Sequence, residues 1–428
     1  MSFSLLHPRD QLVRIMQRIY NGGMTTLSGG NLSIKDEDGS IWITPAGIDK
    51  GKLTPKDIIR IMPDGVFEGV HRPSSEHPFH RAIYAARPDL RAIVHAHPPA
   101  LVSFSIARQV PATNIIPQAR YVCGEVGYAP YALPGSESLG ANIASTFEQG
   151  YHVVLLENHG AVAGGADLLS AFQRLETLDF CARTLIRARQ LGEPTLLTQE
   201  QIALFHEARV SLPTFAPRVP GSRERELRQL LADIVQRAYQ RQLMIGTQGV
   251  VSARLSEDSF IISPTGIDRA EIDAQDMVLV EHGACEANKQ PSRSARMHEA
   301  IYRQHPDIGC IITAQSPAAT AYAITAAHFD TRTIPESYIL LRDIPLVPFG
   351  AQYREPEQVA AAVSLRRPVV LIQNDCVLTV GKTVLETFDR LEVAEYSARA
   401  LIDTAAIGAL VPIGQDDIRA LETAFALI

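Results

Sequence analysis

The sequence lacks the cysteine pattern of a disulfide-stabilised protein. Its five cysteines are scattered over 428 residues and form no CxxC pair. An odd number of isolated cysteines is typical of reduced thiols, so a disulfide framework is excluded as the basis of the fold. The opening stretch, MSFSLLHPRD, contains no apolar segment of secretory length. We therefore expect a cytoplasmic protein.

Long apolar runs and an excess of positive charge are also missing. No run approaches the roughly 20 residues that span a bilayer. The chain carries 40 Lys and Arg against 47 Asp and Glu, which gives a net charge of −7. This balance favours neither nucleic acid nor an anionic membrane surface as a partner. The length itself favours two or three domains.

What the sequence does contain is a long internal repeat. Three pairs of segments match in the same order: ITPAGID (43–49) with ISPTGID (262–268), HRAIYAARPDLRAIVHAHPPA (80–100) with HEAIYRQHPDIGCIITAQSPA (298–318), and VVLLENHG (153–160) with VVLIQNDC (369–376). The offsets are 219, 218 and 216 residues, from 262 − 43, 298 − 80 and 369 − 153. A period near 218 has the length of a whole domain, so we infer that a domain has been duplicated.

The predicted boundary between the two copies is rich in proline. The stretch SLPTFAPRVPGSRE (211–224) has three prolines and a glycine between two helical patterns, which suits a linker. We predict a first domain at 1–210, a linker at 211–224 and a second domain at 225–428. Within a copy, strands and helices mix without strict βαβ order. This predicts an α/β fold with a mixed, largely antiparallel central sheet flanked by helices, present in two tandem copies.

Local patterns in the first copy predict its main elements. Apolar residues at helical spacing predict a helix at 12–20, and NLSI and SIWITP predict a strand pair around KDEDG. SSEHPFHRAIYAARP (74–88) has the signature of a helix with a serine N-cap and a proline in its first turn. RAIVHAH and YHVVLLENHG are predicted strands, with His159 at the end of the second.

Four side chains of the first copy form a candidate metal site. His95 and His97 are two residues apart on a predicted strand, so both project from one face. His159 ends another strand, and Glu76 begins a helix. Three imidazoles and a carboxylate suit zinc or another borderline divalent metal. Taken alone, an HxH pair is more often an ordinary core or surface feature than a ligand pair.

A second candidate feature is an anion site. Ser74 and Ser75 precede a predicted helix, where free N–H groups and the helix dipole favour an anion. Gly29 and Gly30 would allow a ligand to approach the backbone closely. The alternative is a capped helix preceded by ordinary tight turns.

Five motifs together resemble the class II aldolase/adducin family, typified by fuculose-1-phosphate aldolase. They are SGGN (28–31), TPAG (44–47), PSSE (73–76), HAH (95–97) and NHG (158–160). The resemblance implies that His95, His97 and His159 bind one divalent metal per chain, Zn²⁺ before other metals, with Glu76 as a further ligand and general base. It also implies a phosphate or substrate site, formed by Gly30, Asn31, Ala46, Gly47, Ser74 and Ser75.

The activity implied is that of a zinc-dependent lyase. Such an enzyme would cleave a small phosphorylated ketose, or a similar hydroxy-oxo compound, through a metal-stabilised enediolate. A pentulose-phosphate epimerase or a decarboxylase on the same scaffold is an alternative, and so is a non-catalytic interaction protein like the adducin head. In the family a neighbouring subunit contributes a catalytic tyrosine. Its position falls near Ile115 here, and Tyr121 and Tyr338 are the candidates for that role.

The second copy has lost these side chains. Thr313, Gln315, Asp375 and Ser294 stand at the positions of His95, His97, His159 and Glu76. One carboxylate and one amide cannot hold zinc as three imidazoles do, so we expect a metal-free structural domain. The resemblance implies a four-fold ring of subunits, with the active sites between adjacent subunits. We therefore predict a homodimer that builds a four-domain ring, with each site walled partly by a second-copy domain.

Overall fold

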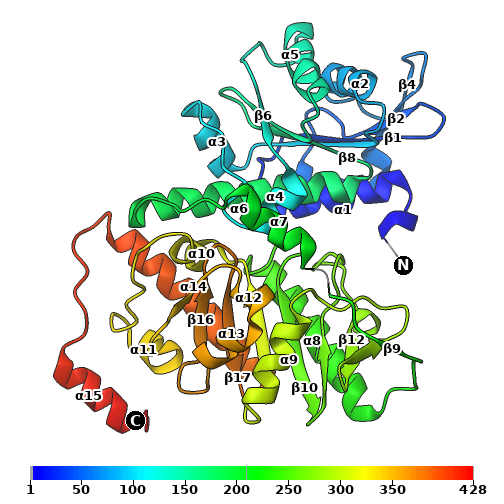
Figure 1. The fold of residues 1–428 in the computed structure, drawn as a ribbon. Coiled ribbons are helices and arrows are strands. Elements are labelled where there is room, and N and C mark those ends of the chain that lie inside the picture. The colour runs from blue at the N-terminus through cyan, green and yellow to red at the C-terminus, as the bar shows by residue number, and fades with distance from the viewer. Residues whose placement is uncertain (1–2, 209, 428) are drawn as a thin grey trace. The chain divides into compact units, whose positions relative to one another are not determined.

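Two sheets flanked by helices make up the computed structural model, which describes residues 3–208 and 210–427 (Figure 1). The first sheet has eight strands in the order β4-β3-β2-β1-β5-β8-β7-β6, and the second has nine in the order β15-β16-β17-β14-β10-β11-β12-β13-β9. Within the described residues, neighbouring strands are antiparallel except in the pairs β6–β7, β15–β16 and β9–β13. The predicted mixed, largely antiparallel α/β fold in two copies is therefore confirmed.

The first copy contains seven α-helices and eight strands within the described residues. The helices are α1 (Pro8–Asn21), α2 (His77–Ala86), α3 (Pro99–Ile106), α4 (Pro117–Cys123), α5 (Glu137–Glu148), α6 (Leu168–Leu191) and α7 (Gln199–Glu207). The strands are β1 (Asn31–Lys35), β2 (Ile41–Ile43), β3 (Ile59–Ile61), β4 (Phe67–Glu68), β5 (Ala92–Ala96), β6 (Val126–Ala129), β7 (Val153–Leu156) and β8 (Ala161–Gly165).

The remaining elements follow the same general order. The helices are α8 (Ser222–Gln240), α9 (Ala295–Gln304), α10 (Pro317–Ala323), α11 (Pro335–Leu341), α12 (Ala351–Arg354), α13 (Pro356–Ala362), α14 (Val384–Thr404) and α15 (Gln415–Ala424). The strands are β9 (Thr214–Phe215), β10 (Val250–Ser256), β11 (Ser259–Ile262), β12 (Val278–Glu281), β13 (Ala284–Glu286), β14 (Cys310–Ala314), β15 (Leu346–Val347), β16 (Val369–Ile372) and β17 (Cys376–Gly381). β9 lies inside the segment expected to be a linker and pairs with β13.

Apolar spacing explains how the helices pack. In α1, Leu12, Ile15, Met16 and Ile19 recur at helical spacing and are fully buried, as the pattern at 12–20 predicts. A second cluster joins Phe79 and Ile83 of α2 to α5 and to the strands of the first sheet. Burial of this apolar surface holds α2 and α5 against the first sheet.

Two local predictions need correction. The N-cap of α2 is Glu76 rather than a serine, and its side chain makes no capping bond. The Ser74 hydroxyl instead accepts a hydrogen bond from the Glu76 amide at 3.3 Å, which leaves the carboxylate free to turn elsewhere. His159 does not end a strand; it lies in the turn between β7 and β8, after Asn158 with a φ of 53°.

The strand register shows that the two copies are equivalent. Asn31 pairs with His95 across β1 and β5, and Val250 pairs with Thr313 across β10 and β14. These are the positions that the sequence repeat aligns. The positions of the missing ligands in the second copy can therefore be assigned residue by residue.

The compact units do not coincide with the sequence repeats. One unit holds the described residues up to Thr113 together with Ala119–Arg183. The other holds Asn114–Gln118 and the described residues from Thr184 onward. The end of the first copy, including α7, thus packs with the second copy. None of the described helices combines the length and the apolar composition needed to cross a membrane.

Candidate active site

Three histidines of the first unit converge at the end of the central strands. His95 is buried in β5, and its Nδ1 donates a hydrogen bond to the Ala161 carbonyl at 3.0 Å. That bond leaves the Nε2 lone pair facing the site, 3.0 Å from Nε2 of His97. With His159, the candidate ligand atoms all lie within 4.8 Å of one another. Among the described residues, this is the one group of its kind.

Close packing fixes the ring of His97. A Cβ atom on Gly160 would lie 2.5 Å from Cδ2 of His97 and 2.6 Å from the Ala96 carbonyl oxygen. Only glycine leaves room for the imidazole at that position. In the second copy, where Gln315 replaces His97, the buried side chain of Cys376 occupies the equivalent of Gly160.

Glu76 faces the same point from the start of α2. Its Oε2 lies 3.3 Å from His95 Nε2, and its Oε1 lies 3.7 Å from His159 Nε2. The Asn31 amide donates to Oε2 at 2.8 Å, whereas Oε1 is buried without a hydrogen-bond partner among the described residues. Burial alone would raise the pKa of Glu76, but His95, His159 and Asn31 outweigh it and hold the pKa well below its usual range. The carboxylate is therefore ionised at neutral pH.

The imidazoles are suited to a cation. Burial, reinforced by the neighbouring histidines, lowers the pKa of His97 to about 3 and that of His159 to about 4. Both rings are neutral at pH 7, so their lone pairs are available to a metal. Tetrahedral zinc with bonds of about 2.0–2.1 Å places its nitrogen ligands roughly 3.3 Å apart, which lies within the span of this cluster. The buried, unpartnered Oε1 of Glu76 adds a negative atom aimed at the same point.

A chain of hydrogen bonds supports Glu76 from behind, and sequence reasoning missed its central residue. Because the amide nitrogen of Asn31 donates to Glu76, its Oδ1 accepts from Nε2 of the buried His80, at 2.5 Å. Nδ1 of His80 then accepts from the Ser33 hydroxyl at 2.7 Å, and Ser33 also contacts the Tyr84 hydroxyl at 2.8 Å. Burial lowers the pKa of His80 to about 3, which keeps this relay neutral. The sequence did contain a signal for His80, because a histidine is also present at the equivalent position of the second copy, His298.

The predicted phosphate residues lie on two adjacent loops beside Glu76. An isolated bridge joins Pro45 to Pro73, and the Ser74 amide donates to the Thr44 carbonyl at 3.2 Å. This brings Ala46 and Gly47 near Ser74 and the exposed Ser75. Gly47 has a φ of 67°, which favours glycine.

Three other residues define the surroundings of these loops. Lys50 is buried, and its Nζ donates to the Pro45 carbonyl at 2.5 Å; burial lowers its pKa to about 8. Gly30 has a φ of 70°, and a Cβ there would lie 2.7 Å from the His95 carbonyl oxygen. The Asn31 side chain, expected at the phosphate, donates an N–H to Oε2 of Glu76 instead.

The two candidate tyrosines lie on equivalent helices. Tyr121 is on α4 and is exposed. Tyr338 is on α11, and its hydroxyl donates to Glu422 of α15 at 2.6 Å. Neither position identifies a catalytic acid.

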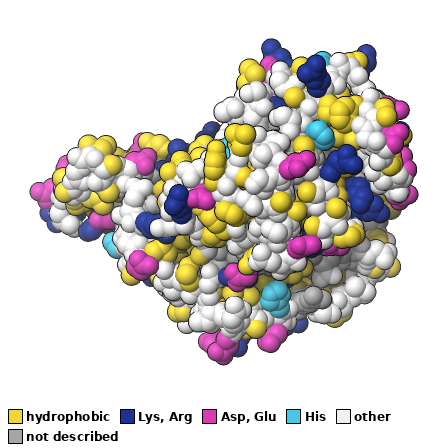
Figure 2. All heavy atoms as spheres, turned by 90° about the horizontal axis from the view of Figure 1, so that it is seen from above, with side chains coloured by type: hydrophobic (Ala, Val, Ile, Leu, Met, Phe, Trp, Pro, Cys, Tyr) yellow, Lys and Arg dark blue, Asp and Glu magenta, His cyan; other side chains and the backbone are white. Residues whose placement is uncertain are grey.

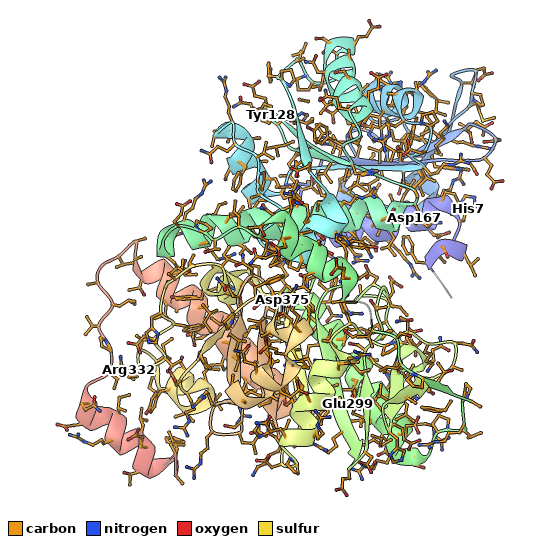
Figure 3. The ribbon with its side chains drawn as sticks, viewed as in Figure 1. His7, Tyr128, Asp167, Glu299, Arg332 and Asp375 are labelled. Atoms are coloured by element: carbon orange, nitrogen blue, oxygen red, sulfur yellow. The ribbon has the colours of Figure 1, made fainter. Side chains whose placement is uncertain are left out.

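The equivalent site of the second copy is filled with amides. Asp375, labelled in Figure 3, is buried and accepts from Nε2 of Gln118 at 2.6 Å and from Nε2 of Gln352 at 2.8 Å. Burial raises the pKa of Asp375 to about 6, although both amide hydrogen bonds oppose the rise. Thr313 and Gln315 are buried beside it.

The supporting relay nevertheless survives in the second copy. The Ser252 hydroxyl contacts Nδ1 of His298 at 2.7 Å and the Tyr302 hydroxyl at 2.8 Å, as in the first copy. Nε2 of His298 has no partner among the described residues, because Val250 stands where Asn31 would be. The relay therefore ends before it reaches a carboxylate.

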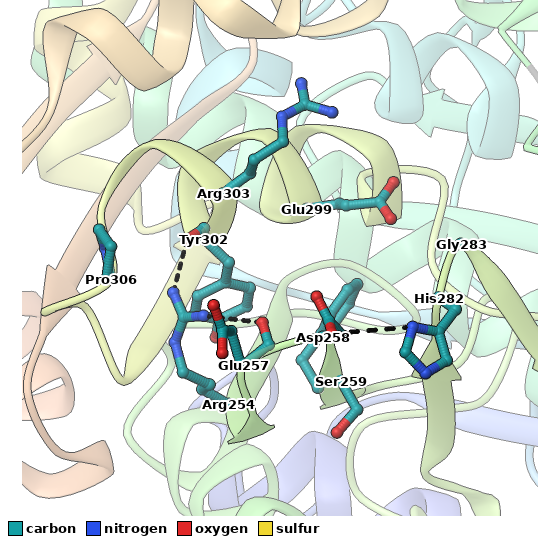
Figure 4. Close-up of a pocket in the computed structure, with 11 residues that line it drawn as sticks. Arg254, Glu257, Asp258, Ser259, His282, Gly283, Glu299, Tyr302, Arg303 and Pro306 are labelled. Atoms are coloured by element: carbon teal, nitrogen blue, oxygen red, sulfur yellow. Dashed lines mark hydrogen bonds and ion pairs between the residues drawn. The ribbon is translucent and has the colours of Figure 1, made fainter.

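A separate pocket lies on the second copy, close to the β10–β11 hairpin (Figure 4). Among the residues that line it, Arg254 donates to the Tyr302 and His305 carbonyls at 2.6 and 3.0 Å, and His282 lies 3.9 Å from Asp258. Acidic and basic side chains are also interspersed on the face shown in Figure 2. These surfaces indicate no large field of one charge.

Comparison with known proteins identifies both copies. The family model for the class II aldolase and adducin N-terminal domain matches residues 10–186 and again residues 229–402. The chain is 33% identical over 197 residues to 5-deoxy-D-ribulose 1-phosphate aldolase of Bacillus thuringiensis serovar kurstaki, covering 45% of this chain and 91% of the relative. It is 32% identical to 3-oxo-tetronate 4-phosphate decarboxylase of Escherichia coli, covering 41% and 85%. A solved L-fuculose 1-phosphate aldolase is 34% identical, covering 47% of this chain and 94% of that one, with a TM-score of 0.43.

Proposed function

Because the chain belongs to the class II aldolase and adducin family, we propose that its first copy is a zinc-dependent aldolase for a small phosphorylated ketose or a similar hydroxy-oxo compound. The observation that carries this proposal is the convergence of three imidazoles, those of His97 and His159 being neutral, on the Oε1 atom of Glu76, which has no hydrogen-bond partner among the described residues. The similar proteins support it, since their names specify aldolases and a decarboxylase that act on phosphorylated compounds.

The residues of the first-copy site divide into metal ligands, a base and donors to the phosphate. His95, His97 and His159 would hold the metal, which when bound supplies Lewis-acid polarisation of substrate oxygens. Glu76 is the candidate base: it is ionised, and Asn31 fixes one of its oxygens while the other faces the site.

The phosphate is assigned to the two loops that meet at the Pro45–Pro73 bridge. They carry Ala46, Gly47, Ser74 and Ser75, and Gly30 and Asn31 lie at the start of β1, opposite His95. Backbone N–H groups and hydroxyls are suitable donors to phosphate oxygens.

A decarboxylase is the second candidate. The Escherichia coli decarboxylase is nearly as similar to this chain as the aldolase, at 32% against 33% identity. Both reactions break a carbon–carbon bond next to an oxygen that a cation polarises, so the same residues serve either.

Around this site we propose a cytoplasmic homodimer in which the second copy is metal-free and structural. The amide-filled site around Asp375 supports a metal-free second copy, and the five buried, free cysteines are consistent with a reducing compartment.

Metal analysis and product analysis test this function. We expect about one zinc per chain in the purified protein, no zinc in His97→Ala, and an unchanged content in Gln315→Ala. Ketose 1-phosphates should then release dihydroxyacetone phosphate, whereas 3-oxo acid phosphates would release carbon dioxide if the decarboxylase is correct. A metal-free wild-type protein, or equal zinc loss in both variants, would refute the assignment.

A further inference from the structure

Lys50 places a positive charge among the loops assigned to the phosphate. Its side chain is 1% exposed, and its Nζ donates to the Pro45 carbonyl at 2.5 Å. Its backbone amide donates to the Leu27 carbonyl at 2.8 Å, which joins residues 44–50 to the glycine-rich loop that ends at Gly30. The buried ammonium therefore belongs to a junction between two loops that both carry residues assigned to the phosphate.

This charge has no counter-ion among the described residues. The carboxylate of the adjacent Asp49 accepts a hydrogen bond from the Gly51 amide at 3.0 Å and forms no ion pair with Lys50 in the described part of the chain. Burial alone lowers the pKa of Lys50 to about 8, and no carboxylate of the described residues offsets that shift. A buried, unpaired cation destabilises a fold. A charge that the protein leaves unbalanced in this way is suited to an anionic ligand.

The second copy satisfies its cation at the same position with backbone atoms. Arg269 is equivalent to Lys50, since 269 − 50 = 219. Its amide donates to the Gly246 carbonyl at 2.8 Å, which repeats the backbone bond made by Lys50. Its buried guanidinium donates to three carbonyl oxygens at 2.9–3.2 Å, those of Gly249, Pro264 and Ile267. The copy without the metal ligands thus binds its buried charge to the chain itself.

The equivalence assigns the Lys50 side chain to the space between the two loops. Gly249 is equivalent to Gly30, with a φ of 89° against 70°, and Pro264 is equivalent to Pro45. The planar group of arginine bonds both loops at once. The ammonium of Lys50 has three donors, yet the Pro45 carbonyl is its one hydrogen-bond partner among the described residues. The copy that keeps the histidines therefore has a buried cation that its own backbone satisfies only in part.

We propose that Lys50 is a positioning residue for phosphate, whose buried ammonium supplies the positive charge that the loops at 44–47 and 73–75 present to a phosphate monoester dianion. The inference rests on the proposed function, and it adds the group that selects a phosphorylated substrate over a neutral one. Lys50 acts through the Pro45 loop rather than by open contact, because its side chain is buried. Its attraction for an anion is stronger there than in water, since the surroundings are less polar.

Anion binding tests this role without any turnover. Inorganic phosphate is titrated into the purified protein and its variants in a calorimeter. Lys50→Met and Lys50→Gln should bind phosphate about 10- to 100-fold more weakly, whereas Lys50→Arg should keep most of the affinity, since it keeps the charge. Arg72→Met is the matched control, because Arg72 is an exposed cation on the neighbouring loop. Unchanged binding in Lys50→Gln, which retains a donor for Pro45, or a larger loss in Arg72→Met, overturns the role of the charge.

The pH dependence of sulfate binding separates charge from structure. Sulfate is a dianion throughout, and Lys50 loses its proton as the pH rises through about 8. Affinity in the wild-type protein should therefore fall about 10-fold between pH 7 and pH 9.5, and in Lys50→Arg it should stay nearly constant. The neighbouring Asp49 and Tyr20 are present in both proteins, so their contributions cancel. The same pH dependence in both proteins overturns the proposal.

Turnover then distinguishes this inference from the proposed function. Lys50→Met should raise KM for a phosphorylated ketose about 10-fold or more and leave kcat within about 3-fold, because the phosphate is held equally before and during the reaction. An equal change in both constants overturns the role of Lys50. A wild-type protein that binds both anions as expected but turns nothing over supports Lys50 and counts against the proposed reaction. A wild-type protein that binds neither anion overturns the phosphate site and the role of Lys50 together.

Discussion

Replacing Asp375 by asparagine should stabilise the second copy in a pH-dependent way. The carboxyl is buried where the first copy has His159, and burial raises its pKa from 3.8 to about 6. A carboxyl with a raised pKa contributes stability while protonated, and loses it as the pH rises through the folded-state pKa. At neutral pH, the wild-type protein therefore holds a buried negative charge at a cost.

The size of the effect follows from the two pKa values. The difference between about 6 and 3.8 corresponds to about 3 kcal/mol above pH 7, at about 1.4 kcal/mol per whole step in pKa. At pH 4.5 the native carboxyl is mostly protonated, and only about 1 kcal/mol of that penalty remains. The stability gained by Asp375→Asn should thus be about 2 kcal/mol larger at pH 8 than at pH 4.5. For a unit of this size, that is roughly 4–8 °C in Tm.

Calorimetry of the wild-type protein and the variant at both pH values measures this difference. Any constant cost of reorienting the Gln118 or Gln352 amide cancels between the two pH values. Asp389→Asn, at an exposed position of α14, is the matched control and should show no such dependence. An equal gain at pH 8 and pH 4.5 would refute the argument that burial of this carboxyl destabilises the fold.

Three further outcomes are expected. His80→Phe should lower turnover about 10- to 100-fold while zinc content falls less, because Glu76 loses its support through Asn31; His298→Phe, its counterpart, should leave turnover unchanged in a steady-state assay. Gly160→Ala should weaken zinc binding in a competition titration, because the new methyl group displaces the ring of His97, whereas Cys376→Ala should bind zinc normally. Removing the metal with a chelator should abolish turnover and leave the far-ultraviolet circular dichroism largely intact, with activity returning on addition of zinc; loss of the fold would contradict a metal held by preformed strands.

Much of the fold could be predicted because it depends on local patterns. Apolar spacing predicts α1, and the repeat places the lost ligands at the correct strand register, with Thr313 opposite Val250. The prediction of the N-cap of α2 was wrong, because it depended on which of several neighbouring polar residues takes the cap position. Serine is the commoner N-cap, but at α2 the cap residue is Glu76, and the Ser74 hydroxyl accepts a hydrogen bond from the Glu76 amide.

The relay through His80 could not be predicted from its own surroundings. A buried histidine on a helix gives no local sign of the strand residues it will bond, Ser33 and Asn31, because they are more than 40 positions away in sequence. The compact units were hidden for the same reason: the segment around Gln118 belongs to the first copy in sequence and to the second in packing.

The pattern of loss in the second copy argues for selection on its shape rather than on its chemistry. Ser252, His298 and Tyr302 keep hydrogen bonds of the same length as those in the first copy, although the carboxylate that the relay served is gone. What changed are the side chains that face the site, and Gln118 now fills the space opposite Asp375. A domain kept only as a spacer would tolerate a solvent-filled cavity there. Instead, the Asp375 carboxylate accepts hydrogen bonds from the Gln118 and Gln352 amides, so protein side chains fill the position that the metal ligands left.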